Sequence, residues 1–375
     1  MITTFRVNES RRLAIFLPNW VGDLVMATPA LQAIEEWAAP KNIELIGIVR
    51  RPLQELLEGS TWLHQCWSYD KRATDGLASE SNLRVRLRRE AIDTALLLTN
   101  SFRTAWLAYR GGIRRRIGYA GDVRRWLLTD PVRRARWRRQ RLPRSAVDDY
   151  LDLARVLGAL PKRVQLELAL TRREENLASN VWQTFGWRDE PVIAFHPGAA
   201  HGAAKCWPVA HFAELARRLI EQTSSLRVLV LCGPGEQQVA SEICDLANHP
   251  QIKSLAGFDL SLGLTKACLA SSEVLVTGDS GPRHIAAAFG VSTYSLFGPT
   301  DPCWANNYHP DDHWLQLEMA CRPCAERQCP LSHHQCMLNL SPEFVCREIL
   351  QREFSRAVPN LILQEPRQLY RRATG

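Results

Sequence analysis

The chain contains 375 residues, of which 46% are hydrophobic and 23% are charged, and its formal net charge is +8. This length and composition are typical of a globular protein with two domains, each large enough to bury a core. The apolar runs fall far short of the roughly 20 residues that a transmembrane helix needs. The first of them, residues 13–17, also lacks a following signal-peptide cleavage site. We therefore expect a cytoplasmic protein.

Short apolar runs alternate with amphipathic stretches, a pattern typical of parallel α/β layers. In the first half we expect strands at 13–17, 43–49 and 94–98, and helices at 24–37 and 148–157. In the second half we expect strands at 192–196, 227–232, 253–256, 274–277 and 293–297, with helices at 208–221, 236–247, 259–270 and 282–289. The polar stretch 160–190 is interpreted as a domain junction. The pattern predicts two Rossmann-like halves that bind ligands at the carboxyl ends of their strands.

The loop that leaves the first expected strand turns at Gly22 and places Asp23 at the start of a helix. Aspartate is common at a helix N-cap. A carboxylate at the carboxyl end of a strand can equally serve as a general base, and the spacing leaves both roles open. The loop has no G-x-G-x-x-G fingerprint, which disfavours a dinucleotide-dependent dehydrogenase.

A basic segment spans residues 110–144, with thirteen arginines, no lysine and only two aspartates. The simplest interpretation is a solvated basic face. Because arginine captures phosphate or carboxylate in bidentate fashion, and because Trp126 and Trp137 lie among these arginines, we favour an anionic macromolecular or membrane-surface partner.

Two glycine-containing loops in the second half are typical of phosphate sites. One follows the strand at 192–196 and contains Lys205, and the other runs from Gly278 to His284 after the strand at 274–277. In the second loop Pro282 suits the first position of a helix, whose free N–H groups favour an anion. Two such loops predict a diphosphate ligand, although His284 alone is also compatible with an ordinary helix-face histidine.

Four of the eleven cysteines form a C-x2-C-x4-C-x6-C cluster at Cys321, Cys324, Cys329 and Cys336. Four soft ligands within so few positions suffice for a tetrahedral zinc ion, and His333 or His334 could replace one of them. The spacing is not the common paired C-x2-C arrangement, so reduced thiols that pack a small loop are the alternative.

Four segments together resemble glycosyltransferase family 9, the ADP-heptose:lipopolysaccharide heptosyltransferases, and within it the heptosyltransferase II group. They are residues 18–31, 196–199 with 205–208, 278–288 and 297–300. The resemblance implies an α/β protein of GT-B fold, with two Rossmann-like domains that face each other across a central cleft. Residues 1–175 would form the acceptor-side domain, and residues 176–375 the ADP-sugar-binding domain, with a Cys-rich loop at 321–336 and a C-terminal helix.

The resemblance also implies an activity, which is inverting, metal-independent transfer of heptose from ADP-L-glycero-D-manno-heptose to the Kdo/heptose inner core of lipopolysaccharide. No cofactor would be required, and the chain contains no Asp-x-Asp motif. The implied partners are the ADP-sugar donor, a lipid A–Kdo glycolipid acceptor and the cytoplasmic leaflet of the inner membrane, touched peripherally, with no nucleic acid.

The resemblance implies a role for each site residue according to its position in the matching segments. Asp23 matches the catalytic base. Matches to the donor-binding residues are Lys205 for the phosphate region, Glu236 for the ribose, Asp279 for the sugar, and Ser280, Gly281 and His284 for the diphosphate. The basic side chains that we expect on the acceptor side are Arg133, Arg134, Arg138 and Arg139. The role of Arg283 is left open.

Three alternatives remain. A family 9 enzyme for another core step, such as heptosyltransferase I or III, would share the same motifs. An arginine-rich nucleic-acid-binding protein would explain the basic segment and the cysteine cluster, but it would leave the two phosphate loops without a role. A sugar-nucleotide-binding protein without catalysis is disfavoured by the intact Asp23.

Overall fold

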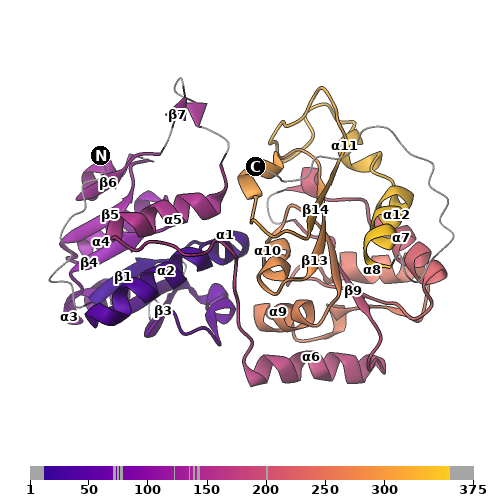
Figure 1. Cartoon of the computed structure of the whole chain (residues 1–375), viewed down its shortest axis with the longest axis horizontal. Helices are drawn as coiled ribbons and strands as arrows, with labels where there is room; N and C mark the ends of the chain where they lie inside the picture. The colour runs from indigo at the N-terminus through magenta and orange to yellow at the C-terminus, as the bar shows by residue number, and fades with distance from the viewer. Residues whose placement is uncertain are drawn as a thin grey trace. The chain divides into compact units, whose positions relative to one another are not determined.

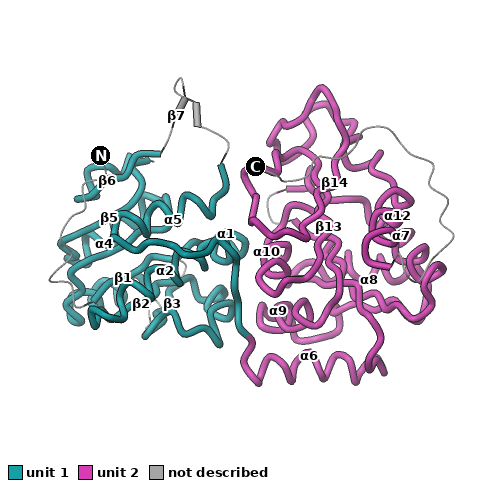
Figure 2. The backbone as a smooth tube through the Cα atoms, viewed as in Figure 1, with its two compact units in different colours: residues 1–169 teal, residues 170–375 magenta. Residues whose placement is uncertain are grey.

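The structure is a computed structural model that describes residues 12–70, 73, 76, 79–121, 123–134, 136–137, 140–141, 144–199 and 202–354, with backbone only at 136–137 and 140–141. The chain forms two compact units, Met1–Ala169 and Leu170–Gly375 (Figure 2). Within the described residues, no helix combines the length and the apolar character that crossing a bilayer requires.

The first unit is built on a six-stranded parallel sheet in the order β3-β2-β1-β4-β5-β6 (Figure 1). Its strands are β1 Arg12–Phe16, β2 Glu44–Arg50, β3 Gln65–Tyr69, β4 Thr94–Leu97, β5 Arg115–Tyr119 and β6 Asp130–Val132. Its helices are α1 Val21–Met26, α2 Thr28–Ala38, η1 Ala39–Lys41, η2 Arg51–Leu57, α3 Glu80–Arg89, α4 Phe102–Arg110, η3 Arg125–Leu127 and α5 Ala146–Leu157. A two-stranded hairpin pairs β7 Arg136–Trp137 with β8 Gln140–Arg141.

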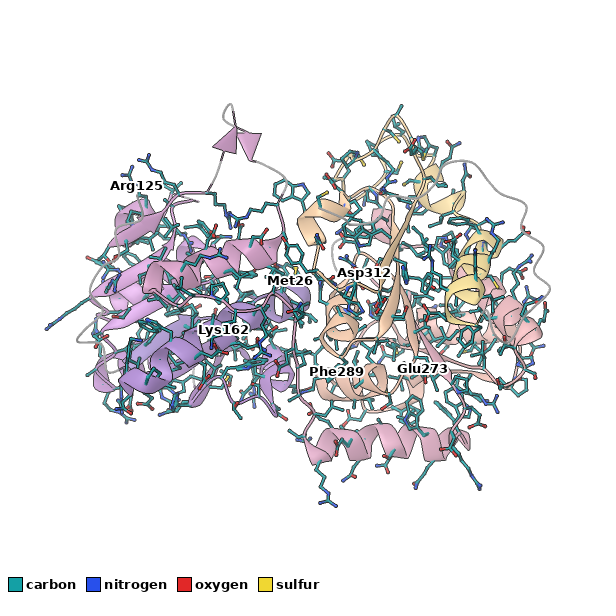
Figure 3. All side chains as sticks on the ribbon, viewed as in Figure 1. Met26, Arg125, Lys162, Glu273, Phe289 and Asp312 are labelled. Carbon is teal, nitrogen blue, oxygen red and sulfur yellow. The ribbon has the colours of Figure 1, made fainter. Side chains whose placement is uncertain are left out.

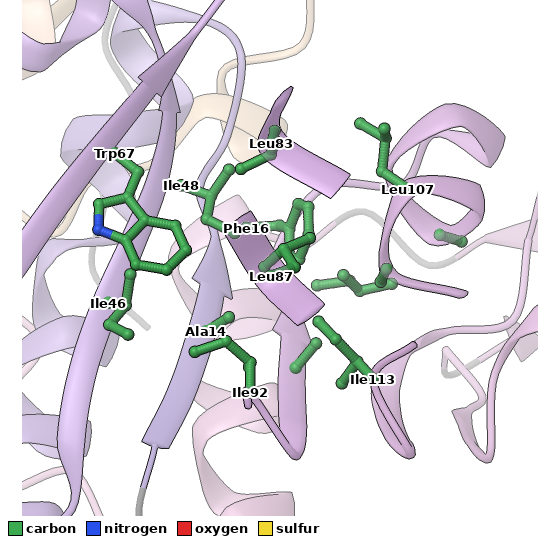
Figure 4. Close-up of a cluster of buried hydrophobic side chains, with 14 of the residues drawn as sticks. Ala14, Phe16, Ile46, Ile48, Trp67, Leu83, Leu87, Ile92, Leu107 and Ile113 are labelled. Atoms are coloured by element: carbon green, nitrogen blue, oxygen red, sulfur yellow. The ribbon is translucent and has the colours of Figure 1, made fainter. Parts of the chain in front are cut away.

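Helices cover this sheet on both faces, with α2 against α5 and α3 against α4. One core layer lies between the sheet and the second pair of helices (Figure 4). There Phe16 and Ile48 from the central strands pack with Leu87 from α3 and Leu107 from α4. Because β1 and its neighbours are buried on both faces, their sequences are almost continuously apolar.

The second unit repeats this topology, with a six-stranded parallel sheet in the order β11-β10-β9-β12-β13-β14. Its strands are β9 Val192–His196, β10 Arg227–Val230, β11 Ile252–Ser254, β12 Val274–Gly278, β13 Ser292–Phe297 and β14 Asp312–Gln316. Its helices are α6 Arg172–Phe185, η4 Ala203–Lys205, α7 Val209–Gln222, α8 Gln237–Ala247, η5 Leu255–Gly257, α9 Leu262–Ala270, α10 Gly281–Ala288, η6 Pro302–Ala305, α11 Gln335–Leu338 and α12 Pro342–Glu353. Both sheets therefore have the 3-2-1-4-5-6 strand order of Rossmann folds, as the sequence predicts.

The boundary between the two units, after Ala169, lies within the polar stretch 160–190 that was interpreted as a domain junction. The same stretch also contains the helix α6, which the sequence did not predict and which starts with a capping box in which Thr171 and Glu174 satisfy each other's backbone N–H groups. Its polar outer face conceals the periodicity of the buried residues Ala178 and Val181. The expected helix at 24–37 is two helices, α1 and α2, which meet at Ala27.

Two buried ion pairs tie the helices of the second unit to its core. Lys266 on α9 pairs with Glu174 on α6 at 2.8 Å. Arg283 on α10 is fully buried and pairs with Asp312 on β14 at 2.5 Å, and it also donates to the carbonyl oxygen of Ala305 at 2.7 Å. Figure 3 labels Asp312 inside this unit. Arg283 is therefore a structural anchor for α10.

Replacing Arg283 with methionine should lower the free energy of unfolding by roughly 3–5 kcal/mol, because the Asp312 carboxylate would stay buried without its partner. Arg217→Met is the matched control, since its pair with Glu214 is largely exposed and such pairs contribute about 0–1 kcal/mol. Urea unfolding followed by circular dichroism measures both. Equal losses for the two variants would show that Arg283 is not an anchor.

Candidate functional site

In the first unit, Asp23 lies in the first turn of α1, directly beyond the carboxyl end of β1. The N-cap of α1 is Trp20, whose side chain makes no capping hydrogen bond, so Asp23 does not have the N-cap role that its sequence position also allowed. The hydroxyl of Tyr150 on α5 donates to Asp23 Oδ1 at 3.1 Å. Burial and the neighbouring Asp23 raise the pKa of Tyr150 well above its usual value, so the phenol remains a donor.

Several arginines of the basic segment have structural partners. Arg124 is fully buried and donates to the carbonyl oxygens of Tyr119 and Thr99 at 2.9 and 2.6 Å. Arg134 pairs with Asp149 at 3.0 Å. Arg133 is exposed. The remaining two arginines expected on the acceptor side, Arg138 and Arg139, lie outside the described residues.

In the second unit, the candidate donor residues gather at the carboxyl ends of β9 and β12. These strands are neighbours, with Thr277 opposite His196 in the register. They flank the point at which the strand order reverses, where ligands of open α/β folds bind. Of the residues predicted from the sequence, the structure brings Lys205, Asp279, Ser280, Gly281, His284 and Glu236 to this end of the sheet.

Lys205 and Asp279 form an ion pair across the two loops. Lys205, at the end of η4, donates to Asp279 Oδ2 at 2.5 Å, and the hydroxyl of Thr300 donates to the same oxygen at 3.0 Å. Burial alone would raise the pKa of Asp279, but the charges of Lys205 and Arg283 lower it overall. Gly278 allows this close approach, because a Cβ there would lie 2.9 Å from the carbonyl oxygen of Lys205.

A hydroxyl and imidazole network joins the ends of the same two strands. Thr277 Oγ1 donates to the carbonyl oxygen of His196 at 3.1 Å and lies 2.8 Å from Ser280 Oγ. Ser280 Oγ in turn lies 3.5 Å from His196 Nδ1. The other ring nitrogen of His196 faces Glu236 Oε2 at 3.6 Å.

Glu236 is the N-cap residue of α8, but its side chain does not cap that helix. It accepts instead from the backbone N–H of Gly233 at 2.7 Å. The neighbouring His196 imidazole and this backbone donor together lower the pKa of Glu236 in spite of its partial burial. A Cβ on Gly198 would collide with the Glu236 carboxylate, so glycine there permits the approach.

The N-terminus of α10 carries no side-chain cap, because Ser280, its N-cap residue, directs its hydroxyl to Thr277. The positive end of the helix dipole is therefore available to an anion. His284 in the first turn is buried, and burial and the charge of Arg283 lower its pKa to about 3. At neutral pH His284 is thus uncharged, so it would meet a diphosphate as a neutral hydrogen-bonding group and not as a cation.

The four clustered cysteines line one small cavity of about 20 Å³, together with His333 and His334. All four are free thiols. The pKa of Cys329 is lowered by backbone N–H groups, chiefly that of His334 at 3.4 Å, whereas burial raises the pKa of Cys336. Among the side chains that the structure describes, no three His, Cys, Asp or Glu residues are arranged to hold a metal ion.

Four side chains of this site were not predicted from the sequence, and they are Tyr150, His196, Thr277 and Thr300. Tyr150 could be found only from the packing of α5 beside α1. His196 and Thr300 each carried a weak signal, since they lie at or just beyond the carboxyl ends of the buried strands β9 and β13.

Proteins of known function resemble this chain in sequence over nearly its whole length. Lipooligosaccharide heptosyltransferase 2 of Campylobacter jejuni is 26% identical over 344 residues, covering 90% of this chain and 98% of the relative. Lipopolysaccharide heptosyltransferase 2 of Escherichia coli is 25% identical over 352 residues, covering 90% and 97%.

Solved structures confirm the predicted GT-B fold. The structure of Escherichia coli ADP-heptose lipopolysaccharide heptosyltransferase II has a TM-score of 0.73 and 24% identity, and covers 91% of this chain and 98% of that one. A family 9 glycosyltransferase from Veillonella parvula has a TM-score of 0.76 and 21% identity, covering 93% and 99%. Residues 81–335 match the model of glycosyltransferase family 9 (heptosyltransferase), and the chain therefore belongs to this family.

Proposed function

We propose that this enzyme transfers heptose from ADP-L-glycero-D-manno-heptose to the Kdo/heptose inner core of lipopolysaccharide. The observation that carries the proposal is the joined pair of loops after β9 and β12, where Lys205, Asp279 and Ser280 lie beside an uncapped helix N-terminus. The heptosyltransferase 2 relatives, each covered over nearly its whole length, support this choice of sugar and acceptor.

In the proposed complex the diphosphate of ADP lies at the N-terminus of α10, near Ser280, Gly281 and Lys205. Glu236, which is partly buried in the β10–α8 loop beside His196, accepts from the ribose hydroxyls. Asp279 contacts the heptose. Positive potential for the leaving diphosphate then comes from Lys205 and the helix end, while neutral His284 contributes a hydrogen bond.

The proposed chemistry is a single inverting displacement. The acceptor hydroxyl oxygen attacks the anomeric carbon, the bond from that carbon to the ADP oxygen breaks, and the hydroxyl proton passes to the Asp23 carboxylate. Such a base contributes roughly 10²–10⁴-fold to the rate. Tyr150 is a positioning residue that holds Asp23 by its hydroxyl. We include metal independence in the proposal, with Lys205 and the dipole of α10 in place of a divalent cation.

Lys205→Ala should weaken ADP binding by about tenfold or more, since a charge-assisted contact contributes roughly 1.5–3 kcal/mol. Its ion pair with Asp279 complicates the single variant, because the unpaired carboxylate would also repel phosphate. The double variant Lys205→Ala/Asp279→Asn removes that repulsion. Calorimetry should show weak ADP binding for both variants, whereas recovery of affinity in the double variant would rule out direct contact of Lys205 with ADP.

Asp23→Asn should lower kcat by about 100-fold or more with little change in ADP affinity, because the carboxylate acts in the transition state. Tyr150→Phe removes one hydrogen bond to Asp23 and should lower kcat by a smaller factor without changing the donor KM. Steady-state kinetics distinguishes these effects. Wild-type turnover of Asp23→Asn would eliminate Asp23 as the base.

The proposal is tested most simply by product masses. The enzyme is incubated with ADP-heptose and with Kdo₂-lipid A that carries either no heptose or one heptose, each with and without EDTA. We expect one heptose to be added only to the acceptor that already has one, and EDTA to leave the yield unchanged. Transfer only to the unheptosylated acceptor would assign the step to a heptosyltransferase I, and loss of transfer with EDTA would overturn metal independence.

A further inference from the structure

Helix α4, Phe102–Arg110, is apolar on two opposite faces. Its inner face supplies Ala105, Leu107 and Ala108 to the core shown in Figure 4. Its outer face carries Phe102, Trp106 and Tyr109, all exposed, at the i, i+4, i+7 spacing of one helical stripe. A surface helix needs only one apolar face for folding, so the outer stripe calls for a different explanation.

The outer rings form one continuous patch with the neighbouring η3 loop. Trp126 is 62% exposed, and its ring lies 6.1 Å from that of Phe102 and 6.4 Å from that of Trp106. Phe102 and Trp106 are stacked at 6.3 Å, and Trp106 contacts Tyr109 at 5.7 Å. Val123, in the same loop, is 85% exposed. We call the four rings, those of Phe102, Trp106, Tyr109 and Trp126, the aromatic patch.

Arginines surround the aromatic patch. The guanidinium of Arg110 lies 5.6 Å from the Trp106 ring and that of Arg116 lies 5.4 Å from the Tyr109 ring. Arg114 and Arg125 are exposed nearby, and Figure 3 shows the Arg125 side chain extending outward. Of the nine arginines in residues 101–134, Arg124 is buried and three pair with carboxylates, namely Arg103, Arg115 and Arg134. The other five are Arg110, Arg114, Arg116, Arg125 and Arg133. The patch is thus an apolar centre with a cationic border.

We propose that the aromatic patch is a docking surface for an anionic phospholipid bilayer. Tryptophan, tyrosine and phenylalanine settle at the boundary between lipid headgroups and acyl chains, while arginine binds the phosphates above it. The rings pack against one another and leave few separate faces for stacked bases, which favours a lipid surface over a nucleic acid. The docking surface would hold the enzyme beside a lipid-linked acceptor. The role in holding the enzyme beside its acceptor rests on the function proposed above, whereas the proposed binding of the patch to the bilayer is independent of that function.

The test measures co-sedimentation of the full chain with vesicles, without donor or acceptor. Vesicles with about one third phosphatidylglycerol should bind the wild type, and pure phosphatidylcholine should bind it far less. Trp106→Ser/Trp126→Ser should weaken binding at least about tenfold. Arg110→Gln/Arg125→Gln should weaken binding to the anionic vesicles by roughly fivefold per arginine, with the difference shrinking as salt rises.

The control variant is Leu246→Ser/Leu338→Ser, which removes two exposed apolar side chains of the second unit and should bind like the wild type. Trp106→Phe/Trp126→Phe keeps the apolar surface, so it should still bind but lose most of the tryptophan quenching by brominated lipid. Circular dichroism checks that every variant is folded.

Equal binding of the patch and control variants would overturn the proposal. So would a patch variant that changes the oligomeric state in light scattering while vesicle binding persists, since the patch would then join two copies of the chain. Loss of oligonucleotide binding with vesicle binding unchanged would assign the patch to nucleic acid. Failure of heptose transfer with vesicle binding intact would count against the proposed function alone.

Discussion

The donor side of the site depends on one buried charge, the guanidinium of Arg283. It lies at 5.1 Å from the Phe297 ring and pairs with Asp312, which also accepts from Ser295 and Trp314 on the adjacent strands. These bonds fix the first turn of α10 relative to β13 and β14. The same charge lowers the pKa of its neighbour His284 and helps to keep Asp279 ionised. Arg283 thus positions the phosphate-binding loop and, together with burial and Lys205, sets its electrostatics.

A network that is already formed supports the binding residues. Lys205 is held by Asp279 and Asp279 by Thr300, so neither side chain of the ion pair has to be ordered when a ligand arrives. His196 and Glu236 are held in the same way. Preorganised donors and charges of this kind stabilise developing negative charge without reorganisation cost during the reaction. An anionic leaving group such as a nucleoside diphosphate benefits most from this arrangement.

Much of the fold could be predicted from the sequence, because the strands β1, β9, β10 and β12 are buried on both faces and read as short apolar runs. Strands β5 and β6 were missed because they lie within the arginine-rich segment, where Arg115 and Asp130 pair across the two strands at 3.1 Å. No pattern in the sequence separates a buried arginine such as Arg283 or Arg124 from a solvated one. Their roles depend on carbonyl oxygens and carboxylates brought close only by tertiary packing.

The candidate site shows the same limits. The two phosphate loops could be predicted because glycine, proline and the ends of buried strands determine the backbone conformation at their own positions in the sequence. The contact of Tyr150 with Asp23 joins residues 127 positions apart, so it could not be predicted from the sequence near either residue. The exposed aromatic stripe of α4 could not be predicted, because its spacing is the same as that of apolar residues on a core-facing helix. Only the exposure of the side chains in the structure distinguishes its outer face from its inner face.

The most direct measurement of the central claim is a crystal structure of the protein with ADP. It should show the diphosphate within hydrogen-bonding distance of the Ser280 and Gly281 backbone and of Lys205, with the ribose at Glu236. A diphosphate bound elsewhere, with the N-terminus of α10 and Lys205 making no contact to it, would contradict the assignment of this loop pair as the donor site.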